Sequence, residues 1–176
     1  MEFKMVSTKT IMTALLVFST FISTPVYGDD RLAYGTRLNE FEGIDVWINS
    51  SPISIASLKN KVVVIDFYTS RCSNCLAAVP HVVALYHKYH GKGLEVVGVH
   101  TPELESERQI EVIKATAKRL GIDYPIAVDN ASRTWNAYSN RYWPNLLIFD
   151  KEGKLVYQHA GEGAYEEIDL KISSLL

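Results

Sequence analysis

The residues of this chain best suited to chemistry are its two cysteines, Cys72 and Cys75, which are separated by two residues. An apolar run, residues 61–68, precedes them, and residues 75–90 carry apolar side chains at helical spacing. The pair therefore falls where a strand ends and a helix begins, with Cys72 at the helix N-cap. Because the free N–H groups and the positive end of a helix favour a thiolate, this placement predicts a dithiol exchange site. In such a site the outer thiolate attacks and the inner thiol resolves the mixed disulfide.

Three other uses of a cysteine pair fit the sequence less well. A c-type haem site needs histidine directly after the second cysteine, where this chain has Leu76. A zinc site needs four ligands, and only His81 lies nearby. A structural disulfide between Cys72 and Cys75 would close too small a loop to stabilise much. Redox exchange is therefore the favoured interpretation, and no metal or cofactor is predicted.

The elements around the cysteines predict an α/β fold. Residues 61–68 and 94–99 read as buried parallel strands joined by the helix of residues 75–90, which Gly91 is expected to end. Strand, helix and strand with short joints form a right-handed crossover. Residues 30–60 suggest a small hairpin ahead of the main sheet. The further elements expected are a helix entered through a capping box of Ser106 and Gln109 and running to Leu120, a strand at 126–128, a helical turn around Trp135 and Tyr138, a hairpin of 146–149 and 155–159, and a closing helix at 166–176.

The N-terminus has the pattern of a secretory signal peptide. Lys4 and Lys9 precede an uncharged apolar run at residues 11–22. That run is well short of the roughly 20 residues that a membrane-spanning helix needs. We expect a signal peptide over residues 1–28 and one folded domain over residues 29–176, with an uncleaved anchor as the alternative. Either reading predicts an exported protein, periplasmic or otherwise extracytoplasmic.

The composition is that of one ordinary folded domain. Of the 176 residues, 47% are hydrophobic, and 18 Lys and Arg stand against 20 Asp and Glu, which gives a net charge of −2. The basic residues form no dense run, so a nucleic-acid partner is not expected. A single core suffices for this length, and we expect a monomer.

Three placements around the cysteines resemble the thioredoxin fold. Asp66 lies six residues before Cys72, Pro80 lies five after Cys75, and Trp143-Pro144 directly precedes a predicted strand. The resemblance implies that Asp66 is a buried acid with a raised pKa that shuttles the proton of the inner cysteine. An acid hydrogen-bonded to backbone at a strand end is the alternative. The resemblance also implies a cis bond before Pro144, packed against the cysteine pair.

A narrower resemblance is to exported thioredoxins of the TlpA/ResA type. Residues 101–130 look like the insertion of that group, and the stretches GVHTPELESE, RYWP and GEGAYEE resemble the thioredoxin-like domain of DipZ-type membrane thiol reductases. The implied architecture is a central mixed sheet flanked by helices, with an N-terminal hairpin and a helix-strand insertion. The implied function is thiol–disulfide exchange with protein substrates, as a reductant supplied with electrons by a separate membrane thiol donor.

Several further residues are candidates around this site. Tyr68, Trp143 and Pro144 are expected to bind an extended substrate chain, with Tyr68 and Trp143 in an aromatic rim. Gly98 stands near the position where thioredoxin has a lysine paired with its buried acid. His100, at the end of the second parallel strand, is either a redox residue or a packing and hydrogen-bonding residue.

Two other functions on the same fold remain open. A Sco-type copper chaperone would hold copper through two thiolates and a histidine, but those proteins have a wider cysteine spacing. A peroxiredoxin-like peroxidase fits the insertion, and Thr69 lies three residues before Cys72, but no proline is near.

Overall fold

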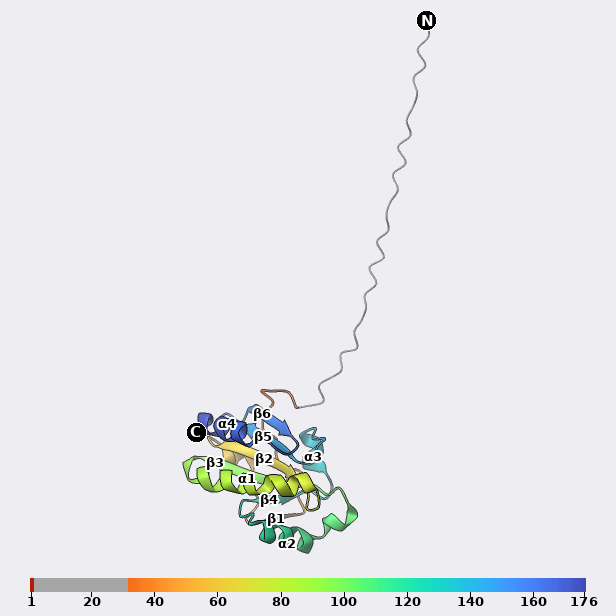
Figure 1. Ribbon diagram of the computed structural model, residues 1–176, viewed down its shortest axis with the longest axis vertical. Helices are drawn as coiled ribbons and strands as arrows, with labels where there is room; N and C mark the ends of the chain where they lie inside the picture. The colour runs from red at the N-terminus through yellow and green to blue at the C-terminus, as the bar shows by residue number, and fades with distance from the viewer. Residues whose placement is uncertain (2–31) are drawn as a thin grey trace.

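The computed structural model describes Met1 and residues 32–176, so the predicted signal peptide lies outside the described residues. A six-stranded sheet runs in the order β1-β4-β3-β2-β5-β6 and is flanked by helices (Figure 1). Within residues 32–176, no helix is long and apolar enough to cross a membrane. The strands are β1 (Val46–Ile48), β2 (Val62–Tyr68), β3 (Leu94–His100), β4 (Ile126–Val128), β5 (Asn145–Phe149) and β6 (Leu155–Ala160), and the helices are α1 (Ser73–Tyr89), α2 (Ile110–Leu120), α3 (Arg133–Ala137) and α4 (Tyr165–Leu175).

The sheet is mixed, as the sequence predicted. β2, β3 and β4 are parallel neighbours, connected through α1 and α2, whereas β5 runs antiparallel to both β2 and β6. β2 is therefore the strand at which parallel and antiparallel pairing meet. Its carboxyl end leads directly into Cys72 and α1, so the cysteine pair sits at the C-terminal edge of the sheet, where open α/β sheets bind their ligands.

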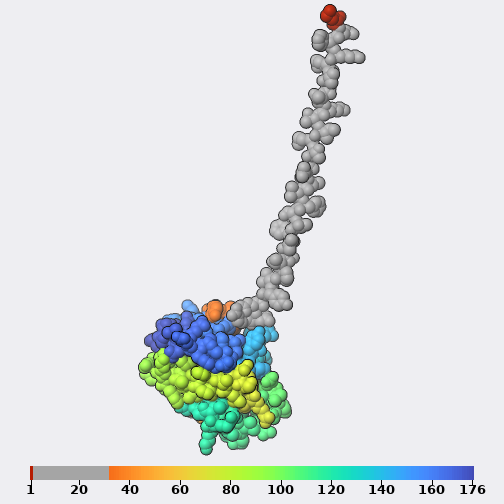
Figure 2. All heavy atoms as spheres, viewed as in Figure 1, coloured from red at the N-terminus to blue at the C-terminus, as the bar shows by residue number. Residues whose placement is uncertain are grey.

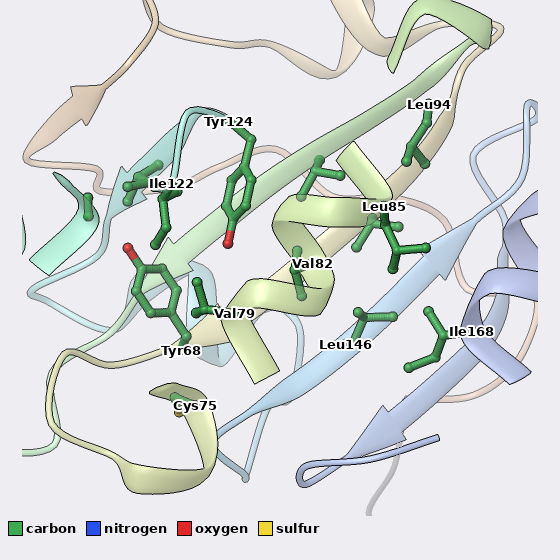
Figure 3. Packing of buried hydrophobic residues seen from close by; sticks show 14 of the residues in the cluster. Tyr68, Cys75, Val79, Val82, Leu85, Leu94, Ile122, Tyr124, Leu146 and Ile168 are labelled. Carbon is green, nitrogen blue, oxygen red and sulfur yellow. The ribbon is translucent and has the colours of Figure 1, made fainter. Parts of the chain in front are cut away.

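β2 is buried along its whole length because both faces of the sheet are covered. Val62, Val64 and Tyr68 face a core cluster that contains side chains of α1, α2 and α4 (Figure 3). Val63, Ile65 and Phe67 face a second cluster, against which the N-terminal segment and α3 pack. Burying each large aliphatic side chain contributes about 1.5–3 kcal/mol, which explains the continuous β-branched run in this strand.

The predicted N-terminal hairpin is wrong. β1 pairs antiparallel with β4. Arg37 forms an isolated bridge with Lys154, which directly precedes β6 at the opposite edge of the sheet. Each stretch pairs with an edge of the main sheet and not with the other stretch. An isolated two-stranded hairpin is at best marginally stable, whereas an edge of the sheet offers partners that are already ordered.

Two helix ends also differ from the expectation. α1 continues past Tyr89 into a 3-10 turn at His90–Lys92, and Gly93, rather than Gly91, takes the left-handed conformation at φ 104°. α2 begins at Ile110, because residues 105–108 form a separate 3-10 turn. The side chain that caps this turn is Glu107, whose Oε2 accepts a hydrogen bond from the backbone N–H of Leu104 at 2.8 Å.

Candidate active site

Cys72 lies at the N-cap of α1, as the sequence predicted. It is half-buried, and its Sγ accepts a hydrogen bond from the backbone N–H of Cys75 at 3.4 Å. That N–H is one of the unpaired donors at the start of a helix, and a negative sulfur would strengthen the bond. The outer cysteine is thus the one that is both accessible and held beside donors suited to a thiolate.

Cys75 lies one helical turn inside the protein, with no exposed surface. Burial raises the pKa of its thiol well above the ordinary value, and its hydrogen bond with Cys72 and the nearby Asp66 carboxylate raise the pKa further. No disulfide joins the two cysteines in this structure. Because an inner thiol of this kind does not ionise by itself near neutral pH, a resolving attack by Cys75 needs a base close by.

Asp66 is the candidate for this base. It is 2% exposed on β2, and burial raises its pKa to about 7, while a hydrogen bond from the Tyr124 hydroxyl to Oδ2 at 3.4 Å acts in the opposite direction. A group with a pKa near 7 holds and releases a proton at physiological pH, which suits a general base. Burial thus agrees with the resemblance to the buried acid of thioredoxins, and the carboxyl is bonded to a side chain rather than to backbone.

No lysine lies opposite Asp66. Its register partner on β3 is Gly98, and a Cβ added there would meet the rings of Tyr124 at 3.0 Å and Tyr68 at 3.1 Å. The two tyrosine rings fill the space that a longer side chain would need (Figure 3). A neutral hydroxyl therefore replaces an ammonium group as the neighbour of the acid, which leaves burial as the dominant influence on its pKa.

Tyr68 does not lie in a substrate rim, so that prediction is wrong. It is 1% exposed, and its ring packs edge-on against the His100 ring, with 5.3 Å between the ring centroids. The reason is the two-residue period of a strand. Tyr68 shares the face of Val64 and Asp66, and this face lies under α1.

Trp143 and Pro144 lie where the sequence placed them, beside the cysteines. The bond between them is cis, and the Cys72 thiol donates to the Trp143 carbonyl at 3.8 Å. The Trp143 indole donates to the Thr101 carbonyl at 3.0 Å and packs against the Trp135 ring, 4.2 Å between centroids. Its neighbour Tyr142 is half exposed. These contacts fix the indole, while the backbone carbonyl of the same residue lies beside the reactive sulfur.

Glu107 is a site residue that the sequence analysis missed. It is fully buried, and its Oε1 accepts from the Thr69 hydroxyl at 2.6 Å and from the Arg71 backbone N–H at 2.8 Å. Its Oε2 accepts from the backbone N–H groups of Glu103 and Leu104 at 3.0 and 2.8 Å. Burial raises its pKa, but these bonds outweigh burial and hold the pKa below its ordinary value. The carboxylate thus ties the insertion to the loop that carries Cys72.

His100 supports the same loop. Its Nε2 shares a hydrogen bond with the Ser70 hydroxyl at 2.7 Å, and burial lowers its pKa to about 4, so the ring is neutral. Of the two roles considered for this residue, the structure favours packing and hydrogen bonding. Within the described part of the chain, no group of three or more His, Cys, Asp or Glu side chains is arranged to hold a metal ion.

Comparison with known proteins gives the family. The model of the AhpC/TSA family matches residues 34–158. The chain belongs to the AhpC/TSA family. One relative is the thiol-disulfide oxidoreductase YkuV of Bacillus subtilis. It is 31% identical to this chain over 137 residues, which cover 78% of the chain and 92% of YkuV. Protein DipZ of Mycobacterium tuberculosis is 43% identical over 140 residues, 78% of this chain but 20% of DipZ, so the chain spans about one fifth of that relative.

Solved structures confirm the thioredoxin-like fold. A solution structure of a thioredoxin-like protein in the oxidised form is 29% identical, with a TM-score of 0.71, and the match covers 82% of this chain and 95% of the other. A thiol-disulfide isomerase from Corynebacterium glutamicum gives a TM-score of 0.73 at 23% identity, over 81% and 96% of the two chains. The predicted resemblance to thioredoxin-like oxidoreductases, DipZ among them, is confirmed for this AhpC/TSA chain.

Asp66→Asn should stabilise the protein at high pH only. The pKa of Asp66 is about 7 in the folded protein and about 4 in the unfolded chain. Between these two pH values the folded state binds one proton more than the unfolded state. The free energy of unfolding of wild type therefore falls as pH rises from about 4 to about 7, and it is level above that range. The variant lacks this loss, and we expect it to match wild type near pH 4 and to exceed it by about 3–4 kcal/mol near pH 8. Urea unfolding of the reduced proteins measures the difference. The exposed Asp45→Asn should follow wild type throughout, and equal stability of Asp66→Asn and wild type at both pH values would contradict the buried-acid assignment.

Glu107→Gln should destabilise the protein strongly for a one-atom change. In the wild type, both carboxylate oxygens accept hydrogen bonds from buried N–H or O–H groups. In the variant, the amide nitrogen replaces one of these oxygens and cannot accept, so buried donors lose their partner at a cost of about 2–4 kcal/mol. Glu105→Gln is the matched control, because that exposed side chain makes only a surface pair with Arg108 and should change stability by less than about 1 kcal/mol. Urea unfolding at pH 7 tests both variants, and equal effects would remove Glu107 from the support of the cysteine loop.

Proposed function

We propose that this protein is an exported, monomeric thiol–disulfide oxidoreductase that exchanges disulfides with protein substrates through Cys72 and Cys75. The observation that carries the proposal is the unequal pair of thiols: Cys72 is accessible at a helix N-cap, and Cys75 is buried beneath it with Asp66 as a nearby acid. The relatives named thiol-disulfide oxidoreductases support this function. Export is supported by the signal-peptide pattern of residues 1–28.

The reaction has two steps. The Cys72 thiolate attacks a substrate disulfide, a mixed disulfide forms, and one substrate sulfur leaves as a thiolate. Asp66 then takes the proton of Cys75, whose sulfur attacks Cys72 Sγ. This attack forms the Cys72–Cys75 disulfide and releases the second substrate thiolate. Two electrons pass to the substrate, and a dithiol donor must return them.

The neighbourhood of Trp143 and Pro144 is proposed to bind the substrate chain. The Trp143 carbonyl lies beside Cys72 Sγ, and its ring is held by Thr101 and Trp135. The half-exposed Tyr142 extends the apolar surface next to it. An extended polypeptide near Cys72 can therefore meet both a rigid aromatic side chain and a backbone acceptor.

Peroxide reduction is less well supported. The Thr69 hydroxyl, which a peroxidase of the related type would turn toward its reactive cysteine, donates instead to Glu107 at 2.6 Å and is fully buried. Copper transport would need a third ligand beside Cys72 and Cys75, and the described residues provide no such group.

Variants of the two cysteines test the order of attack. Cys75→Ser should accumulate mixed disulfides with substrate proteins, because Cys72 still attacks and nothing resolves the intermediate. Cys72→Ser should trap none and should lose more than about 100-fold of wild-type insulin-reducing activity, since nucleophile loss of this kind removes the covalent route. Non-reducing gels and mass spectrometry of the trapped species provide the readout. Equal trapping by both variants would reverse the assignment, and unchanged insulin reduction by Cys72→Ser would exclude the function.

The direction of electron flow is tested by a redox titration. We propose that the protein acts as a reductant fed by a separate membrane thiol donor, in line with its similarity to DipZ-type reductases. The midpoint, measured by tryptophan fluorescence or thiol labelling in glutathione or dithiothreitol buffers, should lie below about −200 mV. A midpoint near about −120 mV would assign the protein to the oxidants.

A further inference from the structure

A small cavity lies next to the buried acid, between the sheet, α1 and α4. It measures about 20 Å³, which is room for about one water molecule. Asp66 of β2 lines it, together with His81 of α1, Tyr165 of α4 and His159 of β6. Leu146 and Ile168, which also line it, appear in Figure 3 on the sheet and on α4.

Strand register places Asp66 and His159 in one row. Asp66 is opposite Leu146 of β5, and Leu146 is opposite His159 of β6. Residues opposite each other in a sheet share a face, and neighbouring strands are about 4.8 Å apart. The two Cα atoms are therefore about 10 Å apart on the same side of the sheet, a span that two inward-pointing side chains and one water can bridge.

His159 links this cavity to solvent. Its Nε2 is buried and has no hydrogen-bond partner within the described structure, although the residue as a whole is partly exposed. A buried imidazole nitrogen without a partner is unusual, because such groups are almost always satisfied. A residue that lines the cavity therefore has a buried nitrogen free to form a hydrogen bond, while another part of the same residue reaches the surface.

The other two titratable side chains that line the cavity, His81 and Tyr165, contact each other. The exposed His81 ring stacks on Tyr165 at 3.5 Å, and the Tyr165 hydroxyl donates to Glu162 at 2.6 Å. Burial raises the pKa of Tyr165 to about 12, so its hydroxyl stays protonated. The two helices that carry these rings, α1 and α4, meet at the surface, yellow-green and blue in Figure 2. Of the titratable groups that line this cavity, His159 is the one whose buried nitrogen has no hydrogen-bond partner in the described structure.

We propose that His159 relays the proton between Asp66 and solvent, through a water in this cavity, during the resolving step. The inference rests on the proposed function. Before Cys75 attacks, the Asp66 carboxyl must have given up its own proton, so that it can accept the proton of Cys75. Asp66 passes its proton through the water to Nε2 of His159, Nδ1 gives up its own proton to solvent, and the carboxylate is left free to take the Cys75 proton. No electron moves in this relay, and His159 acts through Asp66 without touching the reacting sulfurs.

A stopped-flow reaction with Ellman's reagent isolates the step. Reduced protein in excess releases one thionitrobenzoate when Cys72 attacks and a second when Cys75 resolves the mixed disulfide. In dilute buffer at pH 7, His159→Gln should leave the first phase unchanged and slow the second about tenfold or more, because a relayed proton transfer is lost. Added imidazole should restore the second phase, since a small acid or base can replace the missing ring. His159→Phe, which also lacks a titratable nitrogen, should behave in the same way.

His81→Gln is the matched control, because it removes a histidine from the same cavity wall and should change neither phase. A second phase of wild-type speed in both His159 variants would overturn the relay. A slower second phase that no concentration of imidazole restores would overturn it too, because that result assigns His159 a structural role. A wild-type second phase that persists in Cys75→Ser would instead mean that the proposed function is wrong.

Discussion

The burial of a carboxyl group in the centre of the sheet constrains much of this structure. Asp66 lies on β2, where strands pair on both sides and helices cover the face that it shares with Tyr68. Such a group is tolerated in the core only when it binds a proton or finds donors. Gly98 and Tyr124 provide a neutral neighbourhood with one hydroxyl, so the carboxyl binds and releases its proton near neutral pH rather than remaining ionised. The same burial raises the pKa of the neighbouring Cys75 thiol.

A second buried carboxyl group, Glu107, has the opposite chemistry. Four donors surround it, and it stays ionised, whereas Asp66 has one long hydrogen bond and a raised pKa. The pKa values of the two buried acids thus differ because Glu107 accepts more hydrogen bonds than Asp66. Such a difference is typical of acids with different roles. The hydrogen bonds of Glu107 link the insertion to the loop before Cys72, whereas the pKa of Asp66 lies near neutral. The neutral His100 ring, bonded to Ser70, adds support to that loop without adding charge.

The parts of the fold that the sequence predicted well are those in which local pattern and burial agree. The β-branched run of β2, the helical spacing of α1 and the positions of Asp66, Cys72 and Pro144 follow from such patterns and from resemblance. The hairpin prediction failed because strands as short as Val46–Ile48 take their partners from free sheet edges, which a local pattern does not reveal. Tyr68 was assigned to the surface, although it lies two residues after Asp66 on the same strand and therefore shares its buried face. Glu107 was missed because its partners Thr69 and Arg71 are far away in the chain.

The bonds of Glu107 have a consequence for protein engineering. The cysteine loop and the insertion share one buried carboxylate, so the segment Thr69–Cys75 is not a portable module. Grafted onto a thioredoxin without the insertion, it would bury the Thr69 hydroxyl and the Arg71 N–H without an acceptor. Conversely, trimming the insertion to obtain a minimal scaffold would loosen the backbone that aims Cys72. Redesigns of this site should therefore exchange the loop and the turn at residues 103–108 together, as one unit.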